Sequence, residues 1–491
     1  MIENWGDVDR HAIYGSVWVG EDAPVPHVRG LRQDVLEATQ ELAPTVIRWP
    51  GGCPADVYHW KDGVGPRAER PHTLLPMQWS RGLVETNAFG TAEFIDFCRE
   101  VGAAPYINAN VGTGTPEEAA QWVEYCNRTG GTRYAALRAQ HGFAEPFNVP
   151  FWGIGNELYG RWEIGHMDAS AHARIAHEYA KLIHMVDTQV RIVAVGCHRD
   201  EWNYPLLKTA GEDIDDISIH KYYQYEDYDT LVACPVQAER TFSRLAALLD
   251  ALNPRQGKGA PGSEVRTLGG RWPLIAVDEW NVWHEEAGRL AFYQKLTLQD
   301  GIFTAGMFHA FHRMCNYIGM ANLCDLVNSG PCGPIVANEA GIYVNPQYLA
   351  FHMYRYHTGD LVLNAEVVDC GTYDAGEIHA LGEKAPDRID EAPYLDCLAT
   401  FAETRQTLYL AVINRHASED IECAIDLNGF RVSGRGMIYE LNGEDVLAAN
   451  DFDCRTNVRI VERRLDSATA EMGYVFPRHS VTILELAATS G

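Results

Sequence analysis

From about residue 13 to about residue 360, short apolar runs alternate with amphipathic segments along the chain. A short apolar run bounded by turn residues is typical of a strand buried on both faces, and an amphipathic segment between two such runs is typical of the helix in a βα unit. The pattern predicts strands at 13–19, 46–49, 104–111, 151–156, 191–196, 217–223, 274–277 and 316–323, and helices at 34–42, 91–100, 116–126, 170–186, 240–252 and from about 292. Eight such units predict a (β/α)8 barrel.

The pattern changes after about residue 360. Short apolar strands at 407–413, 435–441 and 480–486 are separated by polar turns, which indicates an antiparallel β-sandwich of jelly-roll type. We therefore expect a catalytic barrel over residues 13–360 and a sandwich over residues 361–491. The Gly- and Pro-rich stretch 254–264 is expected to form a surface loop.

Two of the predicted strands end on a glutamate. Glu157 closes Phe151-Trp-Gly-Ile-Gly-Asn-Glu157, and Glu279 closes Leu274-Ile-Ala-Val-Asp-Glu279. Active-site residues of a (β/α)8 barrel lie at the carboxyl ends of its strands, so these two carboxylates are expected to face each other across the barrel mouth. Hydrolysis of a glycosidic bond with retention needs two carboxyl groups about 5 to 5.5 Å apart. The sequence therefore predicts Glu157 and Glu279 as a catalytic pair.

Polar residues near other predicted strand ends fit a sugar site. Asn156 can donate an amide hydrogen to a hydroxyl group, and His220 and Tyr222 end the strand that precedes the one carrying Glu279. Arg48, also near a strand end, would keep a neighbouring carboxylate ionised. We expect Glu157 itself to hold a proton near neutral pH, its pKa raised by the Glu279 carboxylate.

The net charge of −27 excludes nucleic acid and an anionic membrane surface as partners, and it favours a neutral substrate. The first ten residues have no basic segment followed by an apolar core, and the chain contains no apolar run of membrane-spanning length, so we expect a cytoplasmic protein. The twelve cysteines are scattered without a C-x-x-C pair. They are expected to be reduced thiols, with neither a metal nor another cofactor.

Several motifs, in this order along nearly the whole chain, resemble the alpha-L-arabinofuranosidases of glycoside hydrolase family 51. They are Arg48-Trp-Pro-Gly-Gly-Cys53, Tyr58-His-Trp-Lys-Asp-Gly-Val-Gly-Pro66, Glu85-Thr-Asn-Ala-Phe-Gly90, Gly155-Asn-Glu-Leu-Tyr-Gly-Arg-Trp-Glu-Ile-Gly-His166, Ser218-Ile-His-Lys-Tyr-Tyr223, Asp278-Glu-Trp-Asn-Val-Trp283 and Phe476-Pro-Arg-His-Ser-Val-Thr-Ile-Leu484.

The resemblance implies a barrel followed by a sandwich that the first residues, 1–12, also join. It implies a retaining double displacement on terminal non-reducing alpha-L-arabinofuranosyl residues of small oligosaccharides or glycosides, and a role in L-arabinose metabolism. Glu157 matches the general acid/base and Glu279 the nucleophile. Positions that line the sugar pocket match Arg48, Cys53, Asn156, His220 and Tyr222. Members need no metal and are commonly homo-oligomers, often hexamers.

The chain departs from the family pattern at two places. The glutamate that usually ends the first strand corresponds to Val19, with Glu21 two residues on as a substitute, and the family's Gln before Leu-Val-Asn corresponds to Asp325, which we count among the substrate-binding residues. A site that has lost one hydroxyl acceptor selects a different sugar. Two alternatives follow: the same mechanism on another furanoside such as a beta-D-galactofuranoside, and a catalytically silent sugar-binding protein.

Overall fold

The computed structural model describes residues 1–3, 13–76, 82–225, 227–253, 272–283, 295–328, 333–383 and 386–488. The expected loop at 254–264 lies outside these residues, as do residues 4–12 and the start of the helix expected from about 292. Among the described residues, no helix is both long and apolar enough to cross a bilayer. The chain divides into two compact units, the first comprising 1–221, 242–280 and 316–333, and the second 222–241, 281–315 and 334–491.

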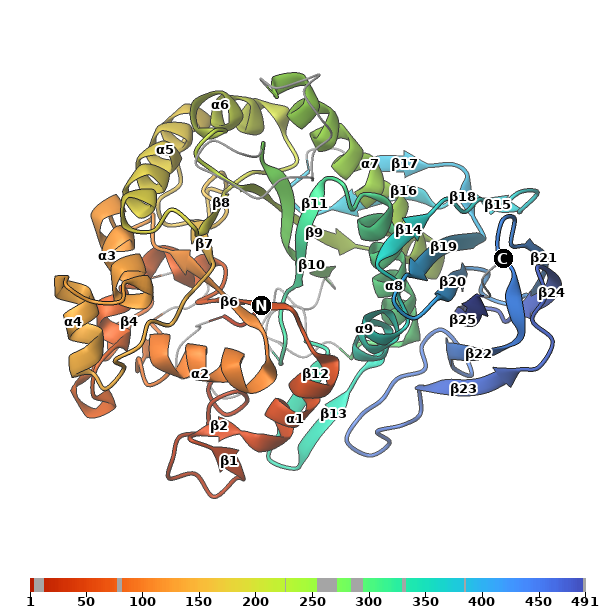
Figure 1. Ribbon diagram of the computed structural model, residues 1–491, viewed down its shortest axis with the longest axis horizontal. Coiled ribbons are helices and arrows are strands. Elements are labelled where there is room, and N and C mark those ends of the chain that lie inside the picture. The colour runs from red at the N-terminus through yellow and green to blue at the C-terminus, as the bar shows by residue number, and fades with distance from the viewer. Residues whose placement is uncertain are drawn as a thin grey trace. The chain divides into compact units, whose positions relative to one another are not determined.

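The first unit is built on a parallel sheet (Figure 1). Its strands lie in the order β11-β10-β9-β8-β7-β6-β3. Their bounds are β3 Val46–Trp49, β6 Ala104–Ala109, β7 Phe151–Ile154, β8 Arg191–Ala194, β9 Asp216–Gln224, β10 Leu274–Val282 and β11 Ile318–Leu323. The apolar side chains of these runs are almost fully buried, Trp152, Ile192 and Ile275 each at 0% exposure. Burial on both faces is what the continuous apolar runs predict.

Helices surround these strands in Figure 1. They are α1 Gln33–Leu42, α2 Thr91–Val101, α3 Pro116–Asn127, α4 Arg133–Gln140, α5 Ala169–Val186 and α6 Asp200–Ala210, and the long helix α7 Tyr228–Leu252 is divided between the two units. Asp168 and Thr115 cap α5 and α3 through their side-chain oxygens, which accept backbone N–H groups of the first turn. The strand–helix alternation is therefore the one expected for a (β/α)8 barrel.

The first barrel strand is not where the sequence predicts it. Residues 13–19 form a turn, because Gly15 adopts a left-handed φ of +81° and the Trp18 N–H donates back to the Ile13 carbonyl at 2.7 Å. Residues 1–3 lie between β11 and β3 instead. The Met1 nitrogen donates to the Leu323 carbonyl at 2.7 Å, and the Ile2 N–H donates to the Arg48 carbonyl at 3.0 Å. Residues 1–3 thus pair with the barrel sheet, not with the sandwich as expected.

The second unit has a six-stranded antiparallel sheet in the order β14-β19-β20-β25-β22-β23. Its strands are β14 Leu361–Leu363, β19 Leu395–Ala402, β20 Thr407–Asn414, β22 Val432–Asn442, β23 Arg459–Leu465 and β25 Ser480–Ala488. One face packs under a separate two-stranded antiparallel sheet, β21 Ile421–Asp426 with β24 Glu471–Phe476, where Leu484 and Phe476 share a core. This is the antiparallel sandwich expected for the C-terminal part.

The other face of that sheet packs against two helices, α8 Leu298–Arg313 and α9 Pro346–Tyr356. Ile302 of α8 and Met353 of α9 share a core with Ile483 of β25. Side chains alternate along a strand, so Ile483 and Leu484 of β25 serve opposite faces. Because α8 and α9 bury their apolar stripe on this sheet, the second unit begins well before the boundary expected at residue 360.

Candidate active site

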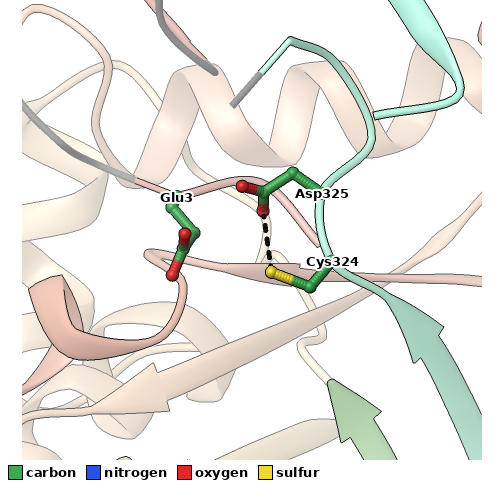
Figure 2. Close-up of side chains that lie close together, drawn as sticks. All are labelled: Glu3, Cys324 and Asp325. Carbon is green, nitrogen blue, oxygen red and sulfur yellow. Dashed lines mark hydrogen bonds between the residues drawn. The ribbon is translucent and has the colours of Figure 1, made fainter. Parts of the chain in front are cut away.

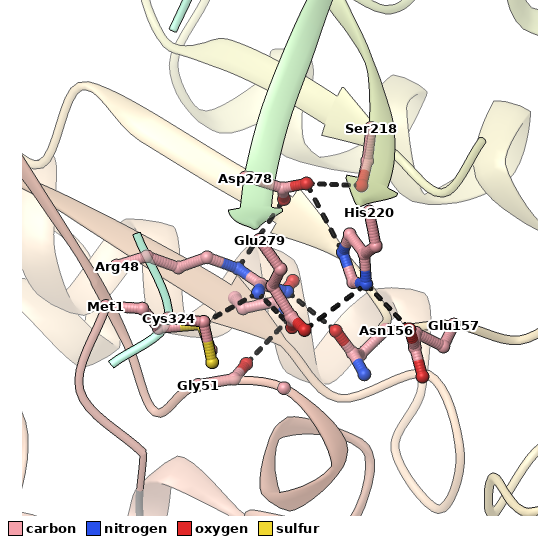
Figure 3. A network of polar contacts seen from close by, with 12 residues as sticks. Met1, Arg48, Gly51, Asn156, Glu157, Ser218, His220, Asp278, Glu279 and Cys324 are labelled. Carbon is pink, nitrogen blue, oxygen red and sulfur yellow. Dashed lines mark hydrogen bonds and ion pairs between the residues drawn. The ribbon is translucent and has the colours of Figure 1, made fainter. Parts of the chain in front are cut away.

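Glu157 and Glu279 meet at the carboxyl ends of β7 and β10. One oxygen of each carboxylate and a ring nitrogen of His220 lie within 4.8 Å of one another. Both side chains are largely buried, with 15% of the Glu157 side chain and 7% of the Glu279 side chain exposed. Figure 3 shows the two carboxylates on either side of His220. So close an approach fits the roughly 5 to 5.5 Å of a retaining glycosidase and leaves no room for the water that an inverting enzyme holds between acids about 6.5 to 9.5 Å apart.

The backbone is irregular at Glu157 and next to Glu279, and this irregularity directs both side chains into the site. Glu157 has a left-handed φ of +43°, a conformation that costs a non-glycine residue of order 1 kcal/mol or more. The pairing of β10 with β11 shifts register between Val277 and Trp280, so the strict alternation of side chains is broken there. As a result Asp278 and Glu279, although adjacent in sequence, both contact Arg48.

Arg48, at the end of β3, is buried and organises this cluster. Its Nη1 donates to Glu279 Oε1 at 2.7 Å, its Nη2 donates to Asn156 Oδ1 at 2.8 Å, and its Nε lies 3.6 Å from Asp278 Oδ2. Burial raises the pKa of Asp278, but the charges of Arg48 and His220 and the hydrogen bonds from His220 and Ser218 together hold it well below its usual value. Arg48 therefore lies against Glu279 and Asp278, the position in which the sequence predicts that it keeps a neighbouring carboxylate ionised, and it also holds Asn156.

His220 lies between the two glutamates. Its Nδ1 is 2.8 Å from Glu157 Oε1 and 3.3 Å from Glu279 Oε2, and its Nε2 is 3.4 Å from Asp278 Oδ1. Burial disfavours the imidazolium, but the charge of Glu279 and the hydrogen bonds to Asp278 and Glu157 raise the pKa of His220 well above its usual value. The imidazole therefore carries a proton among three carboxylates.

This arrangement corrects the expected protonation of Glu157. Burial raises the pKa of Glu157, but the hydrogen bond and charge of His220 and the hydrogen bonds from Trp162 and Tyr159 together lower it below its usual value. The proton assigned to Glu157 from the sequence is held on His220, in a hydrogen bond with the Glu157 carboxylate. His220 was expected in the site, but its position between both acids follows only from the fold.

Two aromatic residues not singled out from the sequence complete the surroundings of Glu157. The Tyr159 hydroxyl donates to Glu157 Oε1 at 3.1 Å, and the Trp162 indole N–H donates to Glu157 Oε2 at 2.8 Å. Both follow the Gly155-Asn-Glu157 segment in the same loop. Their closeness to Glu157 in the sequence is the feature that could have indicated them. Trp162 is 37% exposed, so an aromatic surface adjoins the acid at the open side of the site.

Cys53 and Glu163 form a second contact beside the acid pair. The Cys53 thiol donates to Glu163 Oε1, and the Asn156 amide donates to the same oxygen at 3.4 Å. Burial and the charge of Glu157 raise the pKa of Glu163 to about 9. Cys53 was expected in the site, whereas Glu163 was not. A carboxyl group in a loop carries no periodicity signal, so the sequence did not single it out.

The acid expected to be missing at position 19 is supplied by Glu3. Gly52 N–H donates to Glu3 Oε1 at 2.8 Å, and a side-chain carbon placed on Gly52 would lie 2.5 Å from Glu3 Oε1 and 2.9 Å from Glu279 Oε1. Glu21, the proposed substitute, is instead 52% exposed and paired with Arg67 at 2.9 Å. A carboxyl group therefore lies close to Glu279 although position 19 is a valine, which weakens the structural argument for a galactofuranoside.

Asp325 follows β11 and is buried close to Glu3, with Cys324 beside it (Figure 2). Ligand-type atoms of these three residues lie within 4.8 Å of one another, as do those of Cys53, Glu157 and Glu163 and those of Glu157, His220 and Glu279. Such spacing admits a cation, but closely spaced acids also occur without one, and a sugar site uses the same groups as hydrogen-bond acceptors. The expectation of a metal-free site stays a prediction.

Tyr222 lies two residues after His220 on β9, in the part of the strand that belongs to the second unit. It is buried, and its ring packs edge-on against that of Trp283 at 5.6 Å between centroids. Its role in binding sugar remains a prediction. Trp79, an aromatic residue considered as a cover for the site, lies outside the described residues.

A (β/α)8 barrel with two facing carboxyl groups at this separation places the protein among the glycoside hydrolases. Comparison with known proteins narrows the class. The alpha-L-arabinofuranosidase 1 domain matches residues 38–238, and the alpha-L-arabinofuranosidase C-terminal domain matches residues 278–480. The chain belongs to the alpha-L-arabinofuranosidases of glycoside hydrolase family 51.

Relatives match over most of their length. Alpha-L-arabinofuranosidase C of Emericella nidulans is 32% identical over 96% of this chain and 91% of its own. An intracellular exo-alpha-L-arabinofuranosidase of Bacteroides ovatus is 30% identical over 72% of this chain and 70% of its own. The crystal structure of an alpha-L-arabinofuranosidase from Thermotoga maritima, an arabinose complex, is 36% identical with a TM-score of 0.87, covering 99% of this chain and 96% of that chain. The resemblance inferred from the motifs is confirmed.

Proposed function

We propose that this protein is a retaining exo-acting alpha-L-arabinofuranosidase in which Glu279 is the nucleophile and Glu157 the general acid/base. The observation that carries the proposal is the approach of the two carboxylates to within 4.8 Å at the carboxyl ends of two barrel strands. Family membership supports the substrate, and the buried Arg48–Glu279 ion pair at 2.7 Å supports the assignment of the ionised, attacking group.

In the first step, an oxygen of Glu279 attacks the anomeric carbon while the bond from that carbon to the leaving oxygen breaks. The leaving oxygen takes a proton from Glu157, which receives it from His220 over the 2.8 Å hydrogen bond. In the second step, Glu157 removes a proton from water, whose oxygen attacks the same carbon and releases Glu279 as a carboxylate. Two inversions give net retention, and no step needs a metal.

Substitution of His220 tests the shared proton. Because His220 and Glu157 together hold one proton to higher pH than Glu157 would alone, His220→Gln is expected to move the alkaline limb of the kcat/KM profile to lower pH by about one unit or more. The measurement is kcat/KM on a nitrophenyl arabinofuranoside across the pH range. An unchanged alkaline limb would show that the limb belongs to another group.

Glu157→Ala is expected to separate substrates by leaving group. A poor leaving group needs the proton, so its hydrolysis should fall by roughly 10²- to 10⁴-fold, whereas a dinitrophenyl arabinofuranoside should form the glycosyl-enzyme at nearly the normal rate. Rapid-quench measurement of the first turnover gives both rates. Glu212→Ala, which removes an exposed glutamate, is the control. Equal losses for both leaving groups would contradict the role of Glu157.

The substrate is tested by parallel assays with nitrophenyl alpha-L-arabinofuranoside and nitrophenyl beta-D-galactofuranoside. We expect clear preference for the arabinofuranoside, because Glu3 restores the acid whose loss had suggested a larger sugar. Preference for the galactofuranoside would overturn the substrate assignment. Binding of a furanoside panel without any cleavage would support the silent sugar-binding alternative.

We further propose that the enzyme acts in the cytoplasm on short oligosaccharides or glycosides and assembles as a homo-oligomer, with a hexamer as the first state to test. The naming of the Bacteroides ovatus relative as intracellular supports the compartment. The net charge of −27 supports a neutral sugar as the small-molecule partner. Light scattering after size-exclusion chromatography measures the assembly directly.

A further inference from the structure

A third carboxyl group, Glu163, lies next to the proposed acid/base. Its ligand-type oxygen lies within 4.8 Å of an oxygen of Glu157, and only 6% of the residue is exposed. Among the described residues, the groups that donate hydrogen bonds to its carboxyl group are the Cys53 thiol and the Asn156 amide, neither of which carries a positive charge. Two carboxyl groups this close in a buried site cannot both ionise cheaply.

Among the described residues, the titratable groups with the largest effect on Glu163 come from several elements, and each of them is an acid. Glu157 precedes it in the same loop, Cys53 and Asp56 belong to the 3-10 helix at Cys53–Val57, and Glu279 lies within β10. Burial and the charge of Glu157 are the two largest causes that raise the pKa of Glu163 to about 9. Glu163 therefore keeps its proton at neutral pH while Glu157 is the carboxylate of the pair.

The protonated group has one oxygen to spare. Both side-chain hydrogen bonds of Glu163 to the described residues use Oε1, which accepts from Cys53 and Asn156. A neutral carboxyl group whose Oε1 accepts carries its hydrogen on Oε2, which becomes a donor. The Glu157 carboxylate beside it can only accept, so a neutral Glu163 adds a hydrogen-bond donor next to the acid pair.

We propose that Glu163 is a specificity-determining residue that enters the site as a neutral carboxylic acid and donates a hydrogen bond from Oε2 to an oxygen of the bound sugar, while Oε1 orients Cys53 and Asn156. The proposal rests on the proposed function of the same site. It assigns to a loop side chain a donor that neither strand-end glutamate can provide, and it matches a neutral sugar, whose hydroxyl and ring oxygens accept hydrogen bonds.

Two variants test it. Glu163→Gln keeps one acceptor and one donor in the same shape, so kcat/KM at neutral pH should stay within about threefold of the wild type. Glu163→Ala removes the donor and the group that orients Cys53 and Asn156, so kcat/KM should fall by about 10- to 100-fold, mostly through KM. Equal damage in both variants would show that an ionised Glu163 is needed. Wild-type kinetics for Glu163→Ala would show that the group is idle. Either result overturns the proposal.

A spectroscopic readout separates this proposal from the proposed function. The infrared difference between wild type and Glu163→Gln at neutral pH should contain the carbonyl stretch of a protonated carboxylic acid, and this band should vanish as pH rises through about 9. The measurement needs no turnover, so it can fail while arabinofuranosidase activity stands. Absence of the band at neutral pH overturns the neutral state of Glu163, whatever the variants do to rate.

Discussion

Glu279→Ala is expected to lower kcat on a nitrophenyl alpha-L-arabinofuranoside by roughly 10⁵-fold or more, because the reaction loses the group that forms the covalent intermediate. The fold should survive, since Arg48 keeps Asp278 at 3.6 Å and Asn156 at 2.8 Å as partners. The measurement is kcat under saturating substrate, with circular dichroism as the check on folding. Glu212→Ala again serves as the exposed control.

Azide distinguishes the two roles by stereochemistry. In Glu279→Ala a small anion can take the space of the lost carboxylate and attack the substrate directly, which gives the glycosyl azide of inverted configuration. In Glu157→Ala azide attacks the glycosyl-enzyme instead, which gives the retained product. NMR of the isolated glycosyl azide reads the configuration. The opposite pattern would exchange the assignments of Glu157 and Glu279.

The largest expected loss of stability lies in the second unit, at Asp396. This buried carboxylate accepts hydrogen bonds from Arg415 at 2.5 Å and from Arg313 at 2.8 Å, and it lies 3.2 Å from a ring nitrogen of His309. Asp396→Ala leaves the buried Arg415 guanidinium without this carboxylate, so the free energy of unfolding should fall by about 3 to 5 kcal/mol. Urea unfolding followed by fluorescence measures it.

The control for Asp396→Ala is Asp390→Ala. Asp390 also pairs with an arginine, Arg388, at 2.6 Å, but its side chain is 69% exposed. Loss of an exposed pair should change the free energy of unfolding by no more than about 1 kcal/mol. Similar effects at the two positions would mean that burial does not determine the contribution of the Asp396 cluster.

Much of the barrel could be predicted from the sequence because its strands are continuous apolar runs. The strand expected at 46–49 is β3, and the helix expected at 170–186 is α5 within one residue. The first strand failed because Ile13-Tyr-Gly-Ser-Val-Trp-Val19 has strand-like composition, yet Gly15 turns the chain. Strand propensity indicates which residues suit a strand, but not which segment lies between β11 and β3 in the sheet. Residues 1–3 occupy that place.

The site could be predicted where residues stand at strand ends, and not where the chain brings them from elsewhere. Glu157, Glu279, Arg48 and His220 gather as expected, because the fold places all carboxyl ends of the strands together. Glu3 and Glu163 were not predicted as site residues. Glu3 precedes every expected element, and Glu163 lies in a loop. The sequence also did not predict whether His220 or Glu157 carries the shared proton. That depends on distances of about 3 Å between side chains, which the spacing of residues along the chain does not determine.

The register shift in β10 has a consequence for engineering this scaffold. A regularly pleated strand offers every second side chain to the interior, so one strand end normally supplies one functional group. Here the shift between Val277 and Trp280 lets a single strand present two neighbouring acids to the same guanidinium. Deleting one residue from this stretch to make the strand regular would turn one of those acids outward. A regular strand would therefore remove an acid from the active site.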